Sequence, residues 1–125
     1  MSVAVFLGVC LAGGAGAALR FVVDGWVRSA LPMRFPLGTT VINVTGSFVL
    51  GVVTALTAGH VLPTTWSTVL GTGLMGGYTT FSTASVETVR LLASGDVRLG
   101  LRAGLGTLVI GVLAALAGLW AGSLV

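Results

Sequence analysis

The sequence has very little charge. Six arginines, three acids and no lysine make up 7% of its 125 residues, whereas an ordinary soluble domain carries about 25% charged residues. So few charges cannot cover the surface of a water-soluble globule of this size. We therefore exclude a soluble enzyme, a nucleic-acid-binding protein and a disordered chain, and we predict an integral membrane protein that contacts the lipid bilayer.

Groups that carry chemistry are also scarce. The single cysteine, Cys10, excludes a disulfide framework or a cysteine metal cluster within one chain. No nucleophile–base pair is present, and the one histidine lies in a loop. Cation and proton pathways usually place an acid inside the membrane, but no Asp or Glu lies at the centre of an apolar stretch. These absences argue against an enzyme and against a cation pathway.

Long apolar stretches are what the sequence does contain. Four of them, at about residues 3–23, 37–58, 66–92 and 99–124, are near the roughly 20 residues that a helix needs to cross a bilayer. The first lacks the positively charged start of a signal peptide, so we expect it to be retained. The chain is thus predicted to be all-α, with residues 1–125 forming one domain of four transmembrane helices.

The charges gather at one side of this arrangement. With four spans, loops one and three lie on one side of the membrane, and loop two and both termini lie on the other. All nine charges belong to the half with loops one and three: Arg20, Asp24, Arg28, Arg34, Glu87, Arg90, Asp96, Arg98 and Arg102. Arginine-rich loops stay on the cytoplasmic side. We expect a multi-pass protein of the inner (plasma) membrane, with loops one and three cytoplasmic and both termini outside.

Glycine is abundant, at twenty residues, and small residues let membrane helices approach closely. In the last span Gly104, Gly111 and Gly118 share a face, and Gly100/Gly104 and Gly118/Gly122 form GxxxG pairs. Packing within the chain accounts for many of these glycines. The surplus predicts an oligomer, most simply a dimer.

The second span carries a polar stripe. Thr39, Asn43 and Ser47 are spaced by four residues and therefore lie on one side of a helix. Each polar group inside a membrane must face protein or water. Asn43, with two donors and two acceptors, either lines a pore or clasps a neighbouring helix.

The third span is a poor helix at its centre. Gly76 and Gly77 are followed, after one tyrosine, by Thr79 and Thr80. Unwound backbone at membrane depth is tolerated where it lines a cavity or binds an ion. We predict a helix broken near its middle. Amide N–H groups, hydroxyls and aromatic edges are donors that suit a small anion.

Three blocks of the sequence carry a resemblance to a known family. GGAGAALRF (residues 13–21), PLGTTVINVTGSFVLG (residues 36–51) and GLMGGYTTFSTASVET (residues 73–88) resemble the signature blocks of the Fluc/CrcB fluoride channels, and the resemblance extends over essentially the whole chain. It implies an antiparallel dimer of four-helix subunits with two pores along the interface. Its function would be passive export of cytoplasmic fluoride, which relieves fluoride toxicity.

The resemblance also implies roles for particular residues. It assigns Asn43 and the hydroxyls of Ser82 and Thr83 to the pore, which the stripe extends to Thr39 and Ser47, and it assigns Phe81 a ring edge that faces fluoride. The backbone carbonyls of Gly76 and Thr79 match those that hold a structural Na⁺ at the dimer centre. Arg20 and Glu87 match vestibule positions. Simple ion pairs, Arg20 with Asp24 and Glu87 with Arg90, are the alternatives.

One position departs from the family pattern. The usual TTFSTFS segment has a second phenylalanine where this chain has Ala84. An antiparallel homodimer also needs a chain that inserts both ways, which the one-sided arginines disfavour. We therefore hypothesise a heterodimer with an oppositely oriented homologue, although a homodimer remains open.

Two further alternatives remain. A non-conducting or regulatory subunit would also tolerate Ala84. A small multidrug-type exporter would need a carboxylate in the middle of the first span, and that span has none before Asp24.

Overall fold

The computed structural model describes all 125 residues and contains helices but no strands, so the all-α class is confirmed. The elements are α1 (Val3–Ala30), α2 (Leu37–Ala58), α3 (Thr64–Ser67), η1 (Thr68–Met75), α4 (Gly76–Tyr78), α5 (Phe81–Ala93), α6 (Val97–Leu101), η2 (Arg102–Gly106) and α7 (Thr107–Gly122), where η denotes a π-helix. The π-helices continue the helices around them. The chain therefore forms four long helical segments, of which the third is divided between α4 and α5.

Local sequence determines where these segments begin and end. The Ser2 hydroxyl caps α1 by accepting a hydrogen bond from an N–H of its first turn. Pro32 and Pro36 enclose the first loop, because a residue that precedes proline avoids the helical conformation, and α2 begins directly after Pro36. In the third loop Gly95 has a φ of +89°, and the Asp96 carboxylate caps α6.

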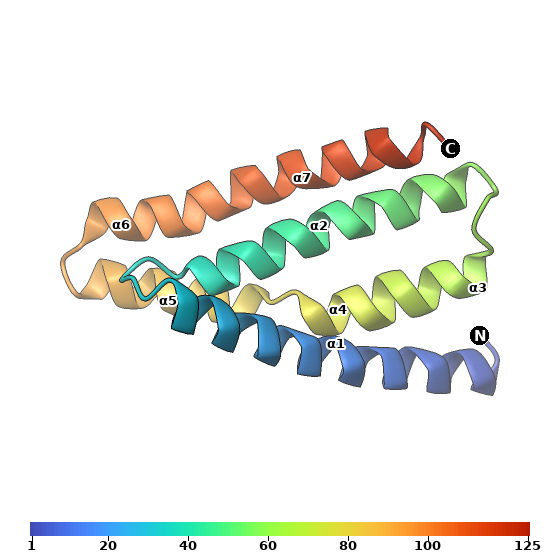
Figure 1. Cartoon of the computed structure of the whole chain (residues 1–125), viewed down its shortest axis with the longest axis horizontal. Coiled ribbons are helices and arrows are strands. Elements are labelled where there is room, and N and C mark those ends of the chain that lie inside the picture. Colours follow the sequence, from blue (N-terminus) through green and yellow to red (C-terminus); the bar gives the residue numbers. More distant parts are fainter.

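The four segments lie side by side along the long axis of the molecule (Figure 1). α2 packs along most of α7, while α1 packs against η1 and α4. Figure 1 also shows the first and third loops at one end and both chain termini at the other end. The nine charged residues thus belong to the half of the molecule with the first and third loops, as the sequence predicts.

Glycines permit the closest helix contacts. A Cβ atom on Gly51 of α2 would overlap the carbonyl oxygen of Ala115, and one on Gly118 of α7 would overlap the carbonyl oxygen of Phe48. A Cβ on Gly77 of α4 would likewise overlap the backbone of α1. Since a backbone atom cannot move aside as a side chain can, only glycine permits these approaches.

The same contacts correct one argument from the sequence. The glycines of the GxxxG pairs in the last segment face the chain's own helices: Gly100 faces Leu92, Gly104 faces Thr88, Gly118 faces Phe48 and Gly122 faces Val52 and Ala55. Packing within the chain uses all four. These glycines therefore do not indicate a second subunit, and any argument for a dimer must come from other features.

The interior is small and the exterior is apolar. Only 18 of 125 residues are buried, and the core cluster consists of Ile42, Met75 and Tyr78. The segments Val3–Ala30, Leu37–Ala58 and Val97–Gly122 are long and apolar enough to cross a membrane. Because water would not accommodate so much exposed apolar surface, the chain is a membrane protein.

Candidate functional site

The interruption of the third segment is the most irregular part of the backbone. α4 ends at Tyr78 and α5 begins at Phe81. Between them Thr79 (φ −78°, ψ 159°) and Thr80 (φ −147°, ψ 121°) are extended. Such a gap leaves carbonyl oxygens at the end of α4 and N–H groups at the start of α5 without helical partners. We call residues 76–82 the break segment.

Asn43 of α2 replaces the missing backbone partners of Thr80. Its side-chain Nδ2 donates to the Thr80 carbonyl oxygen at 2.8 Å, and its Oδ1 accepts from the Thr80 N–H at 2.8 Å. Because the Thr80 N–H donates to Asn43, it does not bond the carbonyl of Gly76 as it would in a continuous helix. Asn43 is thus the interhelical clasp that the sequence left as one of two alternatives, while it also borders a groove between α2, α5 and α7.

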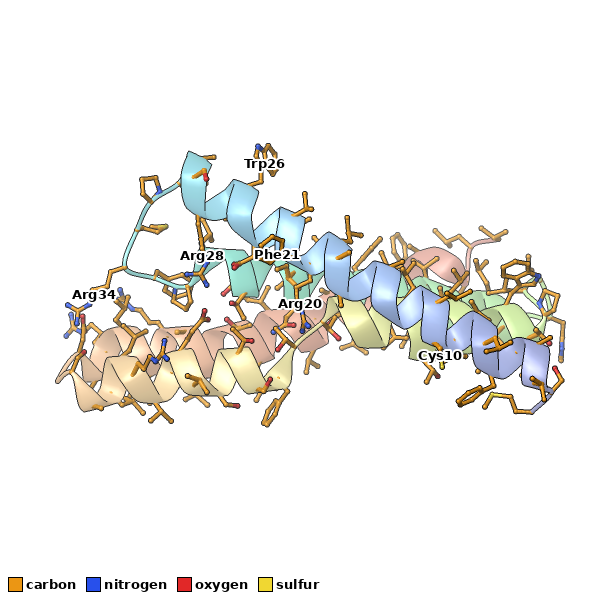
Figure 2. All side chains as sticks on the ribbon, turned by 90° about the horizontal axis from the view of Figure 1, so that it is seen from below. Cys10, Arg20, Phe21, Trp26, Arg28 and Arg34 are labelled. Atoms are coloured by element: carbon orange, nitrogen blue, oxygen red, sulfur yellow. The ribbon has the colours of Figure 1, made fainter.

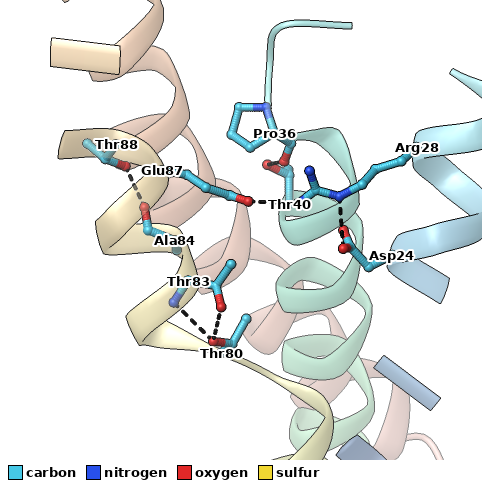
Figure 3. Close-up of polar contacts among 9 residues, drawn as sticks. All are labelled: Asp24, Arg28, Pro36, Thr40, Thr80, Thr83, Ala84, Glu87 and Thr88. Atoms are coloured by element: carbon cyan, nitrogen blue, oxygen red, sulfur yellow. Dashed lines mark hydrogen bonds and ion pairs between the residues drawn. The ribbon is translucent and has the colours of Figure 1, made fainter. Parts of the chain in front are cut away.

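The Thr80 hydroxyl organises the start of α5. It accepts a hydrogen bond from the Thr83 N–H at 3.2 Å and donates to the Thr83 hydroxyl at 3.1 Å (Figure 3). It also lies 3.4 Å from the Ser82 hydroxyl. The side chain of Thr80 is therefore the N-cap of α5. No signal in the sequence separated Thr80 from its neighbour Thr79 in this role.

Arg20 points from α1 toward the break segment (Figure 2). Its Nη1 donates to the carbonyl oxygen of Thr79 at 3.2 Å, and it forms no ion pair with Asp24, which binds Arg28 instead at 2.8 Å. The alternative of a simple Arg20–Asp24 pair is therefore wrong. A guanidinium places positive charge beside the end of α4, where helix carbonyls make the potential negative.

A groove of about 520 Å³ runs beside the break segment. We call it the α2–α5–α7 groove. It is lined by Asn43, Ser47, Thr80, Phe81, Ala84, Ser85, Thr88, Val89, Gly104, Thr107, Leu108, Gly111, Val112 and Ala115. Its polar groups are hydroxyls and one amide, and it contains no charged side chain. Phe81 stands at its border with 88% of its surface exposed, so one side of the groove is open to the surroundings of the chain.

The structure separates the six residues expected to line a pore. Asn43, Ser47 and Phe81 line the groove together. Thr39 is buried in the chain, and the exposed Ser82 and Thr83 do not border the groove. The four-residue spacing does not place the whole stripe at one surface, because neighbouring helices cover α2 differently along its length. The structure adds Ser85, Thr88 and Thr107, whose hydroxyls no motif had singled out.

Ala84 lies in the wall of the groove, one turn along α5 from Phe81. The methyl group fills far less space than the phenylalanine that the family pattern has there. The groove is therefore wider at this point than a second phenyl ring would leave it.

Ion pairs connect the segments at the charged end of the molecule, where the first and third loops lie. Arg28 binds both Asp24 and Glu87, at 2.8 and 2.9 Å (Figure 3). The expected alternative for Glu87, a pair with Arg90 on the same helix, is not formed. The Arg34 Nη1 atom lies 3.4 Å from Asp96 Oδ2, and this ion pair connects the first loop to the third.

These residues border a second hollow of about 370 Å³ at the charged end. We call it the charged-end pocket. Three arginines and one acid line it: Arg28, Arg34, Arg90 and Glu87. Its net charge is positive, which favours the entry of anions. Of the two residues predicted to lie at a vestibule, Glu87 borders this pocket, whereas Arg20 is not among the lining residues and contacts the break segment instead.

Gly76 and Thr79, the residues expected to hold a cation by their carbonyls, both belong to the break segment. Gly76 is exposed, and a Cβ atom added to it would meet nothing within 4 Å. The Thr79 carbonyl accepts from Arg20 but has a second lone pair. No cluster of His, Cys, Asp or Glu that could hold a metal exists elsewhere in the chain.

Comparison with known proteins identifies a family and several relatives. The profile of a family described as "CrcB-like protein, Camphor Resistance (CrcB)" matches residues 7–119. A protein of Leifsonia xyli subsp. xyli named "Fluoride-specific ion channel FluC 1" is 56% identical over 99% of this chain and 90% of its own length.

Two further relatives bear the name "Fluoride-specific ion channel FluC 2". The one from Cutibacterium acnes is 48% identical over 94% of this chain and 96% of its own length. The one from Mycobacterium tuberculosis H37Rv is 42% identical over 96% of this chain and 92% of its own length. All three are named as ion channels and none as an enzyme. The match covers nearly the whole chain, and the chain therefore belongs to the CrcB-like family.

Proposed function

We propose that this chain is a subunit of a fluoride-specific ion channel. The proposal rests on the α2–α5–α7 groove. This groove lies beside the break segment, is bordered by hydrogen-bond donors and contains no carboxylate. The relatives named as fluoride-specific channels support the same function. It is a transport function and needs no catalytic group.

The chemistry of the groove suits fluoride. A small anion holds its water tightly, so a pore must supply donors that replace the lost hydration, as carbonyl oxygens do for K⁺ with the opposite polarity. The Ser47 hydroxyl and the second Nδ2–H of Asn43 border the groove as donors, whereas the Ser85 hydroxyl donates to the Phe81 carbonyl. The exposed ring of Phe81 offers an edge with positive partial charge. An acid at any of these places would repel the ion.

One chain supplies only half of such a pathway. The groove is open on one side and Phe81 projects from the chain, which would be an unfavourable arrangement for a conduction path that faces lipid. A second subunit that covers the open side would complete the lining. In the proposed assembly the two subunits are antiparallel, so that two such grooves form two pores.

The break segment fits a shared cation at the centre of that assembly. Oxygen-only ligands suit a hard cation such as Na⁺, and the Gly76 carbonyl is released from helix bonding because Asn43 takes its partner. Gly76 and Thr79 of one chain provide two carbonyls, so two chains would provide four. The ion would supply positive charge that holds the carbonyl ends of the two broken helices together.

The partner in this proposal is an oppositely oriented homologue. All nine charges lie in the half of the molecule with the first and third loops, which favours a single insertion direction. In addition, Ala84 leaves the groove wider than the phenylalanine of the family pattern would. A partner with both phenylalanines would narrow one of the two pores. The first and third loops would face the cytoplasm and both termini the outside of the plasma membrane. Passive flow would then export fluoride down its gradient.

The test is fluoride efflux from vesicles that contain the purified chain alone, a homologue with the full TTFSTFS segment alone, or both together. We expect fluoride flux and no chloride flux from the mixed vesicles. Efficient flux from this chain alone, with both orientations found by labelling a cysteine in the second loop (Val61→Cys in a chain with Cys10→Ser), would overturn the heterodimer. If flux from the mixed vesicles does not differ from flux with the homologue alone, this chain is a non-conducting subunit. Ala84 is the observation that supports this alternative.

A further inference from the structure

The outward face of the segment Val97–Gly122 carries two arginines that neither the fold nor the groove uses. Arg98 and Arg102 are both exposed, and the three ion pairs of the structure involve other arginines. Being four residues apart, they lie on one side of the helix. The buried residues Gly100 and Ala103 mark the inward side. The two cations are therefore presented together to the surroundings of the chain.

Their position is unfavourable without an external anion. Both arginines lie within the first two turns of this helical segment, where the helix dipole favours negative charge. An unpaired cation on the outside of a membrane helix is also costly unless it reaches polar groups at the interface. Because no acid of this chain binds Arg98 or Arg102, both guanidinium groups are free to bind an anion at the interface.

The same face continues as an apolar stripe. Leu105, Val109 and Leu116 are exposed along it, and it ends at Trp120, which is 67% exposed. The helix rises about 27 Å from Arg102 to Trp120, close to the roughly 30 Å of the bilayer's hydrocarbon core. Tryptophan and arginine are both enriched at membrane interfaces. We call residues 98, 102, 105, 109, 116 and 120 the lipid stripe.

We propose that Arg98 and Arg102 bind the headgroup phosphate of an anionic phospholipid whose acyl chains lie along Leu105 and Val109. Guanidinium groups present paired N–H donors that match phosphate oxygens. Long arginine side chains reach from a helix surface toward the headgroups while their methylene groups stay in the apolar layer. The charge, the length of the stripe and its apolar middle all match this one occupant. The groove lies beside this stripe, but neither arginine lines it, so lipid binding does not depend on fluoride conduction.

Native mass spectrometry of the purified chain tests the proposal, with equimolar phosphatidylglycerol and phosphatidylcholine as the probes. We expect the wild-type chain to retain phosphatidylglycerol preferentially. Replacing Arg98 or Arg102 by Gln should lower that preference about fivefold each, from about 1 kcal/mol for a basic residue at an anionic surface. The double variant R98Q/R102Q should lose more than tenfold, whereas R98K/R102K, which keeps the charge, should retain most of the preference.

Arg34→Gln is the matched control, because Arg34 is an exposed arginine at the same end but already binds Asp96. An unchanged preference in R98Q/R102Q, or an equal loss in R34Q, would overturn the proposal. Displacement of the lipid by millimolar glycerol phosphate would overturn the lipid assignment in favour of a site for free anions. Efficient cross-linking of two chains through Val109→Cys, which lies near the middle of the span where antiparallel copies could meet, in a chain with Cys10→Ser, would show instead that a second protein covers the stripe.

Discussion

The α2–α7 contact and the break segment are stabilised by different kinds of interaction. α2 and α7 approach through glycines such as Gly51 and Gly118, and many small contacts along both helices share the stabilisation. The break segment depends on a few named hydrogen bonds from Asn43, Thr80 and Arg20. The first region is sensitive to added volume, whereas the second is sensitive to the loss of a single donor. Four substitutions test this difference.

The largest effect is expected for Asn43→Asp. The new carboxylate can accept from the Thr80 N–H but cannot donate to the Thr80 carbonyl, and it places negative charge beside an anion path. Loss of the donor and repulsion together should lower fluoride flux at least about 100-fold, since about 1.4 kcal/mol corresponds to tenfold. Efflux from vesicles with the conducting assembly measures this.

Thr54→Val is the control on the same helix, because the Thr54 hydroxyl bonds only to its own helix at Leu50. Wild-type flux in N43D would show that Asn43 neither holds the break segment nor borders the path.

Gly118→Ala should destabilise the fold by about 2 kcal/mol, because its Cβ would overlap the Phe48 carbonyl, a backbone atom that cannot yield. Gly111→Ala is the matched control on the same helix, since its nearest neighbour is the Ser47 hydroxyl at 3.7 Å. Unfolding in mixed micelles compares the two variants. Equal stability would mean that close backbone approach does not hold α2 to α7.

Arg20→Met should lower fluoride flux about 10-fold, through the loss of one charged hydrogen bond to the Thr79 carbonyl. The substitution keeps much of the side-chain volume, so the packing of α1 against the break segment should change little. Hydrogen exchange should show faster exchange of the amides in the break segment. If flux falls while exchange is unaltered, Arg20 acts by its charge alone and does not position the break.

Thr80→Val should have the smallest effect, about 1 kcal/mol of stability from the lost N-cap of α5. Thr79→Val is the neighbouring control, because the Thr79 hydroxyl bonds the Met75 carbonyl of the preceding helix at 2.9 Å and caps nothing. Thermal unfolding of both variants checks the difference. A greater loss in T79V would reverse the assignment of the cap.

Composition and periodicity were sufficient for the coarse architecture. Scarce charge and long apolar stretches predicted a membrane protein made of helices, and the structure and the family both agree. The three sequence blocks predicted the family, which the match over residues 7–119 confirms. These features are local, because each depends on residues that are neighbours in the chain.

Polar pairing could not be predicted in this way. Glu87 had Arg90 within reach on its own helix but binds Arg28, which is 59 residues away in the sequence. Arg20 had Asp24 nearby but donates to Thr79. In both cases the sequence spacing predicted the nearest partner on the same helix. In the folded chain a partner from another segment lies within hydrogen-bonding distance instead.

Composition and local pattern were enough to predict that the chain spans a membrane, that its charge gathers at one end and that its third segment contains residues unsuited to a helix. The arrangement of the helices in space was needed to show that Asn43 satisfies the backbone of Thr80, that Thr39 is buried, and that the glycines of the last segment pack within the chain. This difference arises because hydropathy and backbone preference depend on each residue and its neighbours. Hydrogen bonding and close packing depend on which helices lie side by side and in which register.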